Sequence, residues 1–172
     1  TDKATVTVNP NPDAGLTVSD DMICAGETAT ITVSGSQSGV SYQLRLESND
    51  NNVGAPVAGN GGAISFNVSP SMTTAYNVFA TNSTTSCFAE LTDKPTVTVE
   101  DPLDPGTNGT LNICAGETVT TAALFAALGG MPDPGGIWTP TLAGAGTYTY
   151  THAATANCPA STAQVVVSET TG

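Results

Sequence analysis

Ile23-Cys-Ala-Gly-Glu-Thr28 occurs a second time, letter for letter, as Ile113-Cys-Ala-Gly-Glu-Thr118. A second pair of segments agrees with it, because Lys3-Ala-Thr-Val-Thr-Val8 returns as Lys94-Pro-Thr-Val-Thr-Val99. Two segments that recur at nearly the same offset, about 90 residues, indicate a tandem array of one structural unit. This length is typical of a β-sandwich domain and too long for a solenoid repeat. We therefore expect the chain to be part of a longer repetitive protein.

The chain between the repeated segments reads as short strands joined by turns rich in Gly, Pro and Asn. Apolar and polar residues alternate in several of these strands, which is the pattern of a half-buried strand. One stretch, 121–128, has helical composition, with Thr120 or Thr121 as its cap and Gly129-Gly130 as a left-handed stop. The predicted strands are 5–8, 16–18, 29–33, 41–47, 53–57, 63–68, 75–80, 87–91 and 96–99, followed by 136–139, 146–151 and 161–168 in the second repeat.

These elements predict an all-β fold of two tandem immunoglobulin-like β-sandwich domains, the second containing a short helix. The first domain is expected over 1–100 and the second, which is shorter, over 101–172. Residues 1–8 are placed in the first domain, with the alternative that they close a preceding repeat. The proline-containing segment Glu100-Asp-Pro-Leu-Asp-Pro-Gly106 is expected to be a stiff linker.

The charge of the chain excludes two classes of partner. Three Lys and Arg residues stand against fifteen Asp and Glu residues, so the net charge is -12. A polyanion gains no counterion-release energy on nucleic acid and is repelled by anionic lipid. No apolar run approaches the roughly 18 residues that a membrane helix needs. We therefore expect neither nucleic-acid binding nor direct membrane insertion.

The four cysteines fall one pair to each repeat: Cys24 with Cys87, and Cys114 with Cys158. There is no C-x-x-C pair, and the single histidine does not complete a Cys/His zinc site. We therefore expect one disulfide in each domain, each contributing ~4 kcal/mol in the chain-entropy model. Disulfides indicate an oxidising compartment, so an extracellular location follows.

These residues resemble a known family. Cys24-Ala-Gly-Glu-Thr28, Ala75-Tyr76, Cys87 and the closing Thr-Val-Thr-Val look like the Ig-like repeats of Bacteroidetes surface proteins. The second repeat resembles a companion type, through Leu128-Gly-Gly130, Pro134-Gly-Gly136, Trp138 and the strand that begins Gly146-Thr-Tyr. Such modules are similar to those of very large cell-surface adhesins, including the mobile adhesins of gliding motility. The resemblance implies no catalytic residue and suggests export by the type IX route.

Two groups of side chains are candidate binding sites. Trp138, the only tryptophan, either stacks on a sugar ring beside Tyr148 or Tyr150 or packs in the core against the Cys114–Cys158 bridge. Asp101 and Asp104 lie at the repeat junction, and carboxylates there would hold Ca²⁺ if the loop of Asp133 approached them. Asp-Pro pairs are also ordinary turn formers, which is the alternative.

Other polar residues give no sign of an enzyme. Glu27 and Glu117 belong to the two copies of one motif in separate domains, so a turn role is expected rather than an acid/base pair. His152 has no Ser/Asp constellation that the sequence reveals, and no nucleophile elbow is present. We expect a non-enzymatic protein that requires no cofactor, with Ca²⁺ as the one candidate ion.

The function expected from these observations is that of a stiff, disulfide-stabilised stalk in a bacterial cell-surface adhesin, for surface attachment or gliding. Its partners would be the neighbouring repeats and, through many weak contacts, surface polysaccharide. The alternative is an accessory carbohydrate-binding module of a secreted hydrolase, with Trp138 in its site. An exposed aromatic row would favour the module, and a buried Trp138 would favour the stalk.

Overall fold

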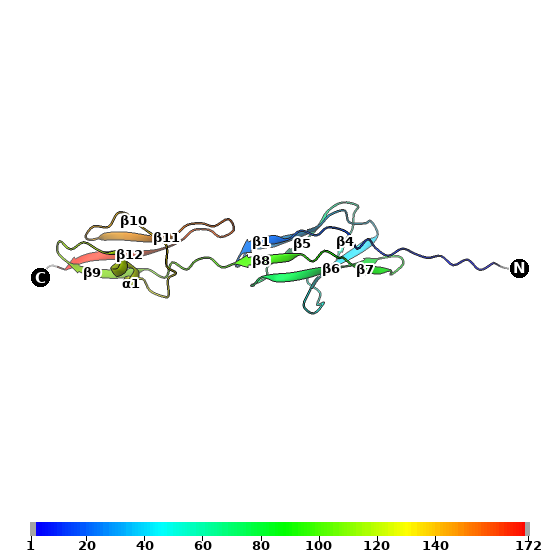
Figure 1. Ribbon diagram of the computed structural model, residues 1–172, viewed down its shortest axis with the longest axis horizontal. Coiled ribbons are helices and arrows are strands. Elements are labelled where there is room, and N and C mark those ends of the chain that lie inside the picture. The colour runs from blue at the N-terminus through cyan, green and yellow to red at the C-terminus, as the bar shows by residue number, and fades with distance from the viewer. Residues whose placement is uncertain (1–2, 171–172) are drawn as a thin grey trace. The chain divides into compact units, whose positions relative to one another are not determined.

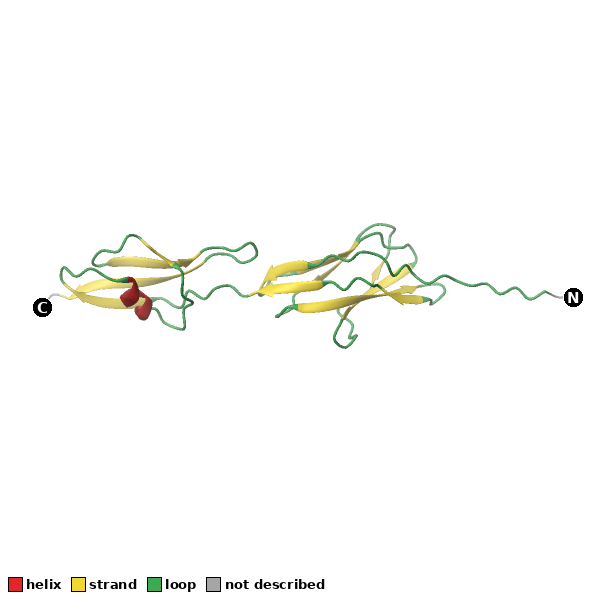
Figure 2. Cartoon of the chain, in the orientation of Figure 1, coloured by secondary structure: helices red, strands yellow, loops and turns green. Residues whose placement is uncertain are grey.

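A computed structural model of the chain, which describes residues 3–170, contains two compact units, Thr1–Glu100 and Asp101–Gly172 (Figure 1). We call them unit 1 and unit 2. Both are built almost entirely of strands, and the single helix lies in unit 2 (Figure 2). The all-β, immunoglobulin-like fold class with a short helix in the second unit is confirmed.

Unit 1 is a sandwich of two antiparallel-rich sheets. The larger sheet has the order β1-β8-β6-β3-β4, with β7 also pairing with β6, and the smaller sheet pairs β2 with β5. Residues that alternate along the strands, such as Ile31, Leu44 and Val78, are fully buried between the sheets. The strands are β1 (Asp21–Cys24), β2 (Ala29–Val33), β3 (Val40–Leu46), β4 (Val57–Ala58), β5 (Ile64–Val68), β6 (Thr74–Asn82), β7 (Phe88–Glu90) and β8 (Thr96–Glu100).

Unit 2 has one sheet of four strands, in the order β10-β11-β12-β9, and a helix that supplies the second layer. Leu124 and Leu128 of the helical segment share a core with Tyr148, Tyr150 and Val165 of the sheet. The helix therefore takes the role that the second sheet has in unit 1. The elements are β9 (Gly109–Cys114), α1 (Thr121–Ala127), β10 (Ile137–Thr139), β11 (Gly146–His152) and β12 (Ser161–Thr170).

Both units close in the same way, by parallel pairing of the strand that carries the cysteine motif with the last strand of the unit. In unit 1, β1 pairs with β8, and Cys24 lies opposite Glu100. In unit 2, β9 pairs with β12, and Cys114 lies opposite Thr170. The motif strands β1 and β9 were not among the predicted elements, although the motif itself was the strongest signal in the sequence.

Several predicted elements differ from the structure. Residues 5–8 form no strand, and the side chains of Val6 and Val8 are 85% exposed. The predicted strand 16–18 is reduced to one bridge between Val18 and Val33. In 53–57 only Val57 belongs to a strand. Each of these segments lacks the continuous partner strand that a ladder requires.

The helix begins as predicted but ends differently. The side chain of Thr120 accepts a hydrogen bond from the N–H of Ala123 at 3.2 Å, which makes it the N-cap. The C-cap is Leu128, whose backbone is extended, with ψ 141, and the predicted stop, Gly129-Gly130, follows it. The left-handed glycine is Gly130, with φ 78, one residue further on.

The predicted pairing of the cysteines is wrong. Cys24 and Cys158 are the disulfide-bonded cysteines of the structure, whereas Cys87 and Cys114 are free thiols. The expectation of one disulfide within each domain therefore fails, because each predicted pair contains one free thiol. The strand register explains why neither predicted pair forms.

Unit 1 holds its two cysteines at opposite ends. In the register of the sheet, Val97 of β8 lies opposite both Asp21 of β1 and Thr74 of β6, and Cys24 lies three residues from this level. The carbonyl of Cys87 accepts the N–H of Asn82, which lies eight residues from the same level in the opposite direction. At about 3.3 Å per residue, this separation is roughly 35 Å. A disulfide requires Cα atoms within about 7 Å, so the pair Cys24 and Cys87 is geometrically excluded.

Unit 2 repeats this separation. Cys114 lies opposite Thr170, at the end of β12, while Cys158 precedes Ser161, the first residue of the same strand. The nine residue steps between Ser161 and Thr170 correspond to roughly 30 Å. The predicted pair Cys114 and Cys158 is therefore excluded on the same ground.

Candidate functional site

The two copies of the cysteine motif fold into the same turn. In unit 1 the N–H of Glu27 donates to the carbonyl of Cys24 at 3.0 Å, and in unit 2 the N–H of Glu117 donates to the carbonyl of Cys114 at 3.1 Å. The glycine between them has positive φ in both copies, 90° at Gly26 and 81° at Gly116, a conformation that favours glycine.

The glutamate of the second copy also closes its turn through its side chain. A carboxylate oxygen of Glu117 accepts the N–H of Cys114 at 2.8 Å. This contact supports the turn role that was expected for Glu117, and it engages the carboxylate in a backbone hydrogen bond rather than in chemistry with a second acid.

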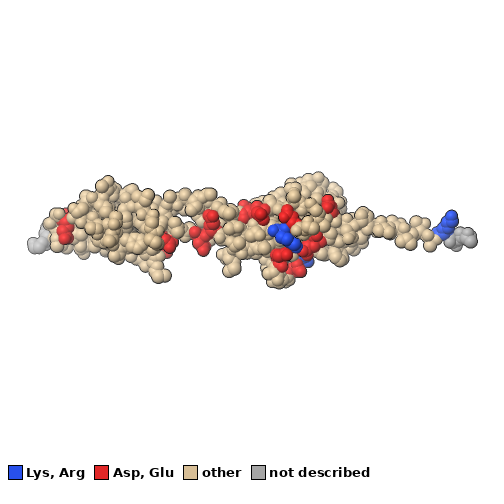
Figure 3. Space-filling model, viewed as in Figure 1, with Lys and Arg blue, Asp and Glu red and all other residues tan. Residues whose placement is uncertain are grey.

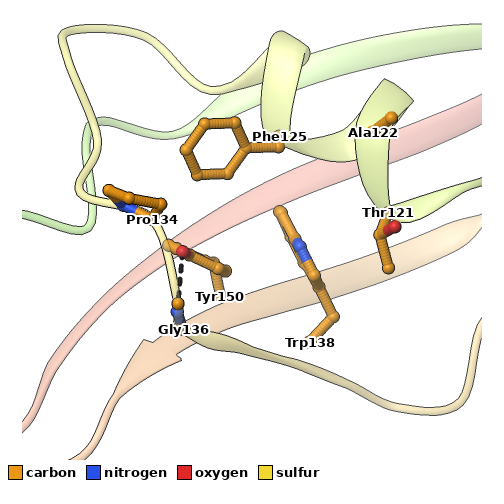
Figure 4. Close-up of a pocket in the computed structure, with 8 residues that line it drawn as sticks. Thr121, Ala122, Phe125, Pro134, Gly136, Trp138 and Tyr150 are labelled. Atoms are coloured by element: carbon orange, nitrogen blue, oxygen red, sulfur yellow. Dashed lines mark hydrogen bonds between the residues drawn. The ribbon is translucent and has the colours of Figure 1, made fainter.

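An aromatic pocket lies in unit 2, between the helix and the loop before β10 (Figure 4). Its volume is about 310 Å³. The rings of Phe125, Trp138 and Tyr150 line it, with ring centroids of Trp138 and Tyr150 5.0 Å apart and those of Phe125 and Tyr150 5.6 Å apart. Thr121 and Pro134 contribute to its rim.

Trp138 is half-buried at the edge of the unit 2 core rather than packed on a disulfide. Its burial therefore lies between the two expected cases, since Trp138 is not fully buried and does not belong to an exposed row of aromatic rings. One face packs on Tyr150, and the indole also borders the pocket (Figure 4). The sequence identified Trp138 as a candidate, but the convergence of Phe125 and Tyr150 on it depends on the fold of three separate segments.

The hydroxyl of Tyr150 fastens the pocket loop to the sheet. It accepts the N–H of Gly136 at 2.8 Å and donates to the carbonyl of Asp133 at 2.8 Å. Because both roles of this hydroxyl are filled, a ligand in the pocket would meet the aromatic ring faces and not a free Tyr150 hydroxyl.

His152 belongs to the same structural group. It is 4% exposed, its Nε2 is hydrogen-bonded to the carbonyl of Asp133 at 3.1 Å, and its ring packs edge-on to Tyr150. These contacts explain His152 as a hydrogen-bonded residue of the unit 2 core.

The junction carboxylates partly meet the arrangement that calcium would need. Asp133 does approach Asp104: its carboxylate accepts the N–H of Asp104 at 2.8 Å, and its own N–H donates to the carbonyl of Asp104 at 2.8 Å. A carboxylate oxygen of Asp104 accepts the N–H of Gly106 at 2.8 Å. Asp101 is exposed. Within residues 3–170 no group of three or more His, Cys, Asp or Glu side chains is placed to hold a metal. Calcium binding by Asp101 and Asp104 therefore stays a prediction.

Two basic residues of unit 1, Arg45 and Lys94, lie in one charged cluster beside strands β3, β6 and β7, and Figure 3 shows blue next to red in unit 1. Arg45 contacts Glu90 at 2.7 Å and Asp50 at 3.4 Å, and its guanidinium lies 4.4 Å from the ring centroid of Phe79. Lys94 pairs with Glu90 and, at 3.1 Å, with Glu47. Arg45 and Lys94 are therefore both engaged in intramolecular ion pairs, and neither is available to bind an anionic partner.

The charged cluster shifts the pKa values of two of its members. The amide of Asn77 and then the ammonium of Lys94 lower the pKa of Glu47 below its usual value. Desolvation acts to lower the pKa of Lys94, but its hydrogen bonds to Glu90 and Glu47 outweigh this effect and raise it.

The described residues include no helix that is long and apolar enough to cross a membrane. No protein-family model and no curated protein matches the chain. Among solved structures it is similar to a titin fragment, Titin-A168169, at 14% identity, over 92% of this chain and 99% of that chain, with a TM-score of 0.44. It is also similar to the titin domains z1z2 in complex with telethonin, at 14% identity, over 96% and 100%, with a TM-score of 0.43.

A third similar structure holds Sidekick-1 immunoglobulin domains 1-5, at 11% identity, over 88% of this chain and 38% of that chain, with a TM-score of 0.38. All three are tandems of immunoglobulin-like domains by their descriptions or fold.

Proposed function

We propose that the chain is a load-bearing segment of a large bacterial cell-surface adhesin, in which tandem immunoglobulin-like units form a stalk for surface attachment or gliding. It acts outside the cell and catalyses no reaction. The observation that carries the proposal is the parallel pairing of the motif strand with the last strand in both units.

Parallel pairing of the first and last strands suits a unit that is pulled through its two ends. In β1 and β8 the register runs from Asp21 opposite Val97 to Cys24 opposite Glu100, so both strands point the same way. Tension on the chain pulls β1 toward its N-terminal end and β8 toward its C-terminal end, so the two strands are sheared past each other. The ladder hydrogen bonds then share the load at once instead of opening one after another.

The exposed N-terminal segment supports an array with further units. Its Thr-Val-Thr-Val is identical to that of β8, where Val97 is fully buried, yet Val6 and Val8 are 85% exposed. The same four residues therefore form the last strand of unit 1 at 96–99, whereas at 5–8 they pair with no strand. A preceding unit, whose last strand they would be, gives these valines a place to be buried.

Pulling the chain by its ends in a single-molecule force measurement tests the proposal. The N–H of Ala25 donates to Glu100, and N–H groups alternate sides along a strand, so the N–H of Ile23 also faces β8. Ile23→Pro removes this donor, whereas Ile23→Ala loses comparable burial and keeps it. We expect the unfolding force of unit 1 to fall further for Ile23→Pro than for Ile23→Ala.

Equal forces for the two variants would contradict the shear mechanism, since then the β1–β8 ladder bears no more load than the core. Circular dichroism of each variant, recorded before pulling, establishes that unit 1 is folded in the molecules that are measured. An unfolding force for the wild-type chain no greater than that of a unit pulled open from an edge would likewise contradict it.

A second function is supported by the aromatic pocket. Phe125, Trp138 and Tyr150 present apolar ring surface around a cavity of about 310 Å³, which is a suitable size for part of a sugar chain. In this proposal the chain is a carbohydrate-binding module, either within the adhesin or attached to a secreted hydrolase. A titration of Trp138 fluorescence with a soluble glycan tests this function.

A further inference from the structure

The motif cysteine lies at the same end of both units, the end at which the last strand leaves. Cys24 lies opposite Glu100, the last residue of β8, and Cys114 lies opposite Thr170, the last residue of β12. This equivalence follows from the shared motif and from the parallel closing pair of each unit.

The later cysteine lies at the other end, beside the segment by which the chain enters its unit. The thiol of Cys87 is 3.7 Å from the carbonyl oxygen of Asn9, to which it donates. Ser161, three residues after Cys158, donates its hydroxyl to the carbonyl of Leu103 at 2.7 Å. Each unit therefore carries one cysteine at its entrance and one at its exit.

The loops that hold the two later cysteines also share a local geometry. A threonine hydroxyl accepts the cysteine N–H in both, Thr85 for Cys87 at 3.3 Å and Thr155 for Cys158 at 2.9 Å. The two positions are equivalent in their backbone contacts, in addition to their place in the repeat.

The equivalent cysteines differ in chemical state and in exposure. Cys24 and Cys158 are disulfide-bonded and 4% and 5% exposed. Their counterparts, Cys114 and Cys87, are free, the first exposed and the second half-buried. Since the other cysteine of the same unit is roughly 30 to 35 Å away in both cases, neither Cys87 nor Cys114 can form a disulfide within its own unit.

We propose that Cys87 and Cys114 are the covalent attachment points for further units of the array. Cys114, at an exit, pairs with the entrance cysteine of the unit that follows. Cys87, at an entrance, pairs with the exit cysteine of the unit that precedes. This inference rests on the proposed tandem array and specifies how its neighbours are joined, by disulfides between units instead of within them.

The bond forms by thiol–disulfide exchange with an oxidised dithiol, either a small disulfide such as oxidised glutathione or a disulfide oxidoreductase. One thiolate attacks a sulfur of the oxidant and displaces the first thiol, forming a mixed disulfide. The second cysteine then attacks the protein sulfur and displaces the second thiol. Two protein thiols are oxidised, one disulfide of the oxidant is reduced to two thiols, and the two protons pass to these leaving groups.

A head-to-tail fusion of two copies tests the inference. The second copy starts at Asn9 and follows Thr170 of the first, because residues 3–8 repeat the sequence of the closing strand and β12 takes their place. After equilibration in a glutathione redox buffer and denaturation, free thiols are titrated. The single chain should give two, from Cys87 and Cys114. We expect the fusion to give the same number, whereas twice that number would overturn the inference.

Peptide mapping without reduction identifies the pair. We expect Cys114 of the first copy to be linked to Cys87 of the second. Cys114→Ser in the first copy should abolish this linked peptide, and the matched control, Cys114→Ser in the second copy, should leave it intact. A link from Cys87 to Cys24, or from Cys114 to Cys158, would overturn the inference.

The single chain provides a measurement that does not depend on folding of the fusion. At high concentration in the same buffer it should form a ladder of disulfide-linked oligomers, joined through Cys114 and Cys87. Cys87→Ser or Cys114→Ser alone should abolish the ladder and leave monomer, because each link joins one Cys114 to one Cys87, whereas a mixture of the two variants should stop at dimers. Absence of linked species, or only dimers through identical cysteines, would overturn the inference. The force measurement on Ile23 variants uses the single chain and is independent of these links, so either proposal can fail while the other stands.

Discussion

Gly136 packs directly against the ring of Tyr150 and donates its N–H to the hydroxyl of the same residue at 2.8 Å. A Cβ atom added at Gly136 would lie 2.5 Å from Cζ of Tyr150, closer than such atoms approach in real structures. Tyr150 is 2% exposed and centres the unit 2 core, so it has little freedom to move aside. A single glycine thus sets how closely the pocket loop approaches the sheet.

Gly136→Ala should therefore destabilise unit 2 by about 1 to 3 kcal/mol, the usual cost of overpacking. Gly144→Ala is the matched control, because its added Cβ would meet only the flexible Glu169 carboxylate, at 3.3 Å, and a carbonyl at 3.5 Å. Urea unfolding of both variants measures the difference. A Gly136→Ala protein as stable as the control would mean that the loop yields and that the contact with Tyr150 is not constraining.

If the aromatic pocket binds polysaccharide, Trp138 will report it, since it is the only tryptophan. We expect a saturable change in its fluorescence with a soluble glycan. Phe125→Ala should weaken binding about tenfold, because an aromatic face contributes about 1 to 2 kcal/mol. Phe88→Ala, which removes a 60% exposed ring of unit 1, is the control. No response across neutral and acidic glycans would exclude the pocket as a sugar site.

The calcium hypothesis can be separated from a turn role of Asp104. The Asp104 carboxylate caps the N–H of Gly106, so Asp104→Ala should lower the stability of unit 2 by about 1 kcal/mol, equally in chelator and in Ca²⁺. A calcium site made by Asp101 and Asp104 predicts a different result. Ca²⁺ would then raise the melting temperature of the wild-type chain and leave that of the Asp101→Asn Asp104→Asn variant unchanged.

The lowered pKa of Glu47 makes a prediction about acid. A carboxyl group whose pKa is lower in the folded state stabilises the fold above its unfolded pKa, and this contribution is lost as the pH falls through the folded pKa. Compared with Glu47→Gln, the wild-type unit 1 should be more stable at pH 7, and the difference should shrink in acid as the pH falls through the lowered pKa of Glu47. Urea midpoints of both proteins across this range measure it. A constant difference would contradict the shift.

Lys94 makes the opposite prediction at high pH. Its pKa is raised, so its pairing with Glu90 and Glu47 contributes fully below the unfolded pKa and is lost as the pH rises through the folded value. Lys94→Met should therefore approach the wild-type stability only in strongly alkaline solution. Because Lys94 is partly exposed, its effect at pH 7 should be small, and salt should reduce it further.

Local pattern was sufficient where a strand alternates and has a nearby antiparallel partner. β2 was predicted with its observed bounds, because Ala29-Thr-Ile-Thr-Val33 alternates and pairs throughout with β5. The helix was found from composition and its Thr120 cap. In these segments the residues themselves carry the period that the structure uses.

The local sequence pattern was insufficient where a segment becomes a strand only through its pairing with a distant strand. Thr-Val-Thr-Val is a strand at 96–99 and no strand at 5–8, although the letters are the same. β1 and β9 were missed because each is held in place by a parallel partner more than 50 residues away in the sequence. The cysteine pairing failed for a related reason, since the sequence gives the number of cysteines in a repeat but not the end of the unit at which each one lies.

The aromatic pocket shows an intermediate case. Trp138 was identified because a single tryptophan is conspicuous, and Tyr150 was named beside it. Phe125 was assigned only to the helix, and nothing in its local sequence indicates that α1 brings it to within 5.6 Å of Tyr150. Sites formed by three separate segments require the tertiary structure.

The charged cluster of unit 1 also limits where proteases that cleave after Lys or Arg can cut the chain. Arg45 is held within β3, its side chain 15% exposed and paired with two carboxylates, and Lys94 is followed by Pro95. A protease that requires a basic residue before the scissile bond would therefore find, between residues 3 and 170, one open cleavage site, after Lys3. Cleavage after Lys3 falls in the exposed segment that precedes β1 and leaves every strand of both units intact.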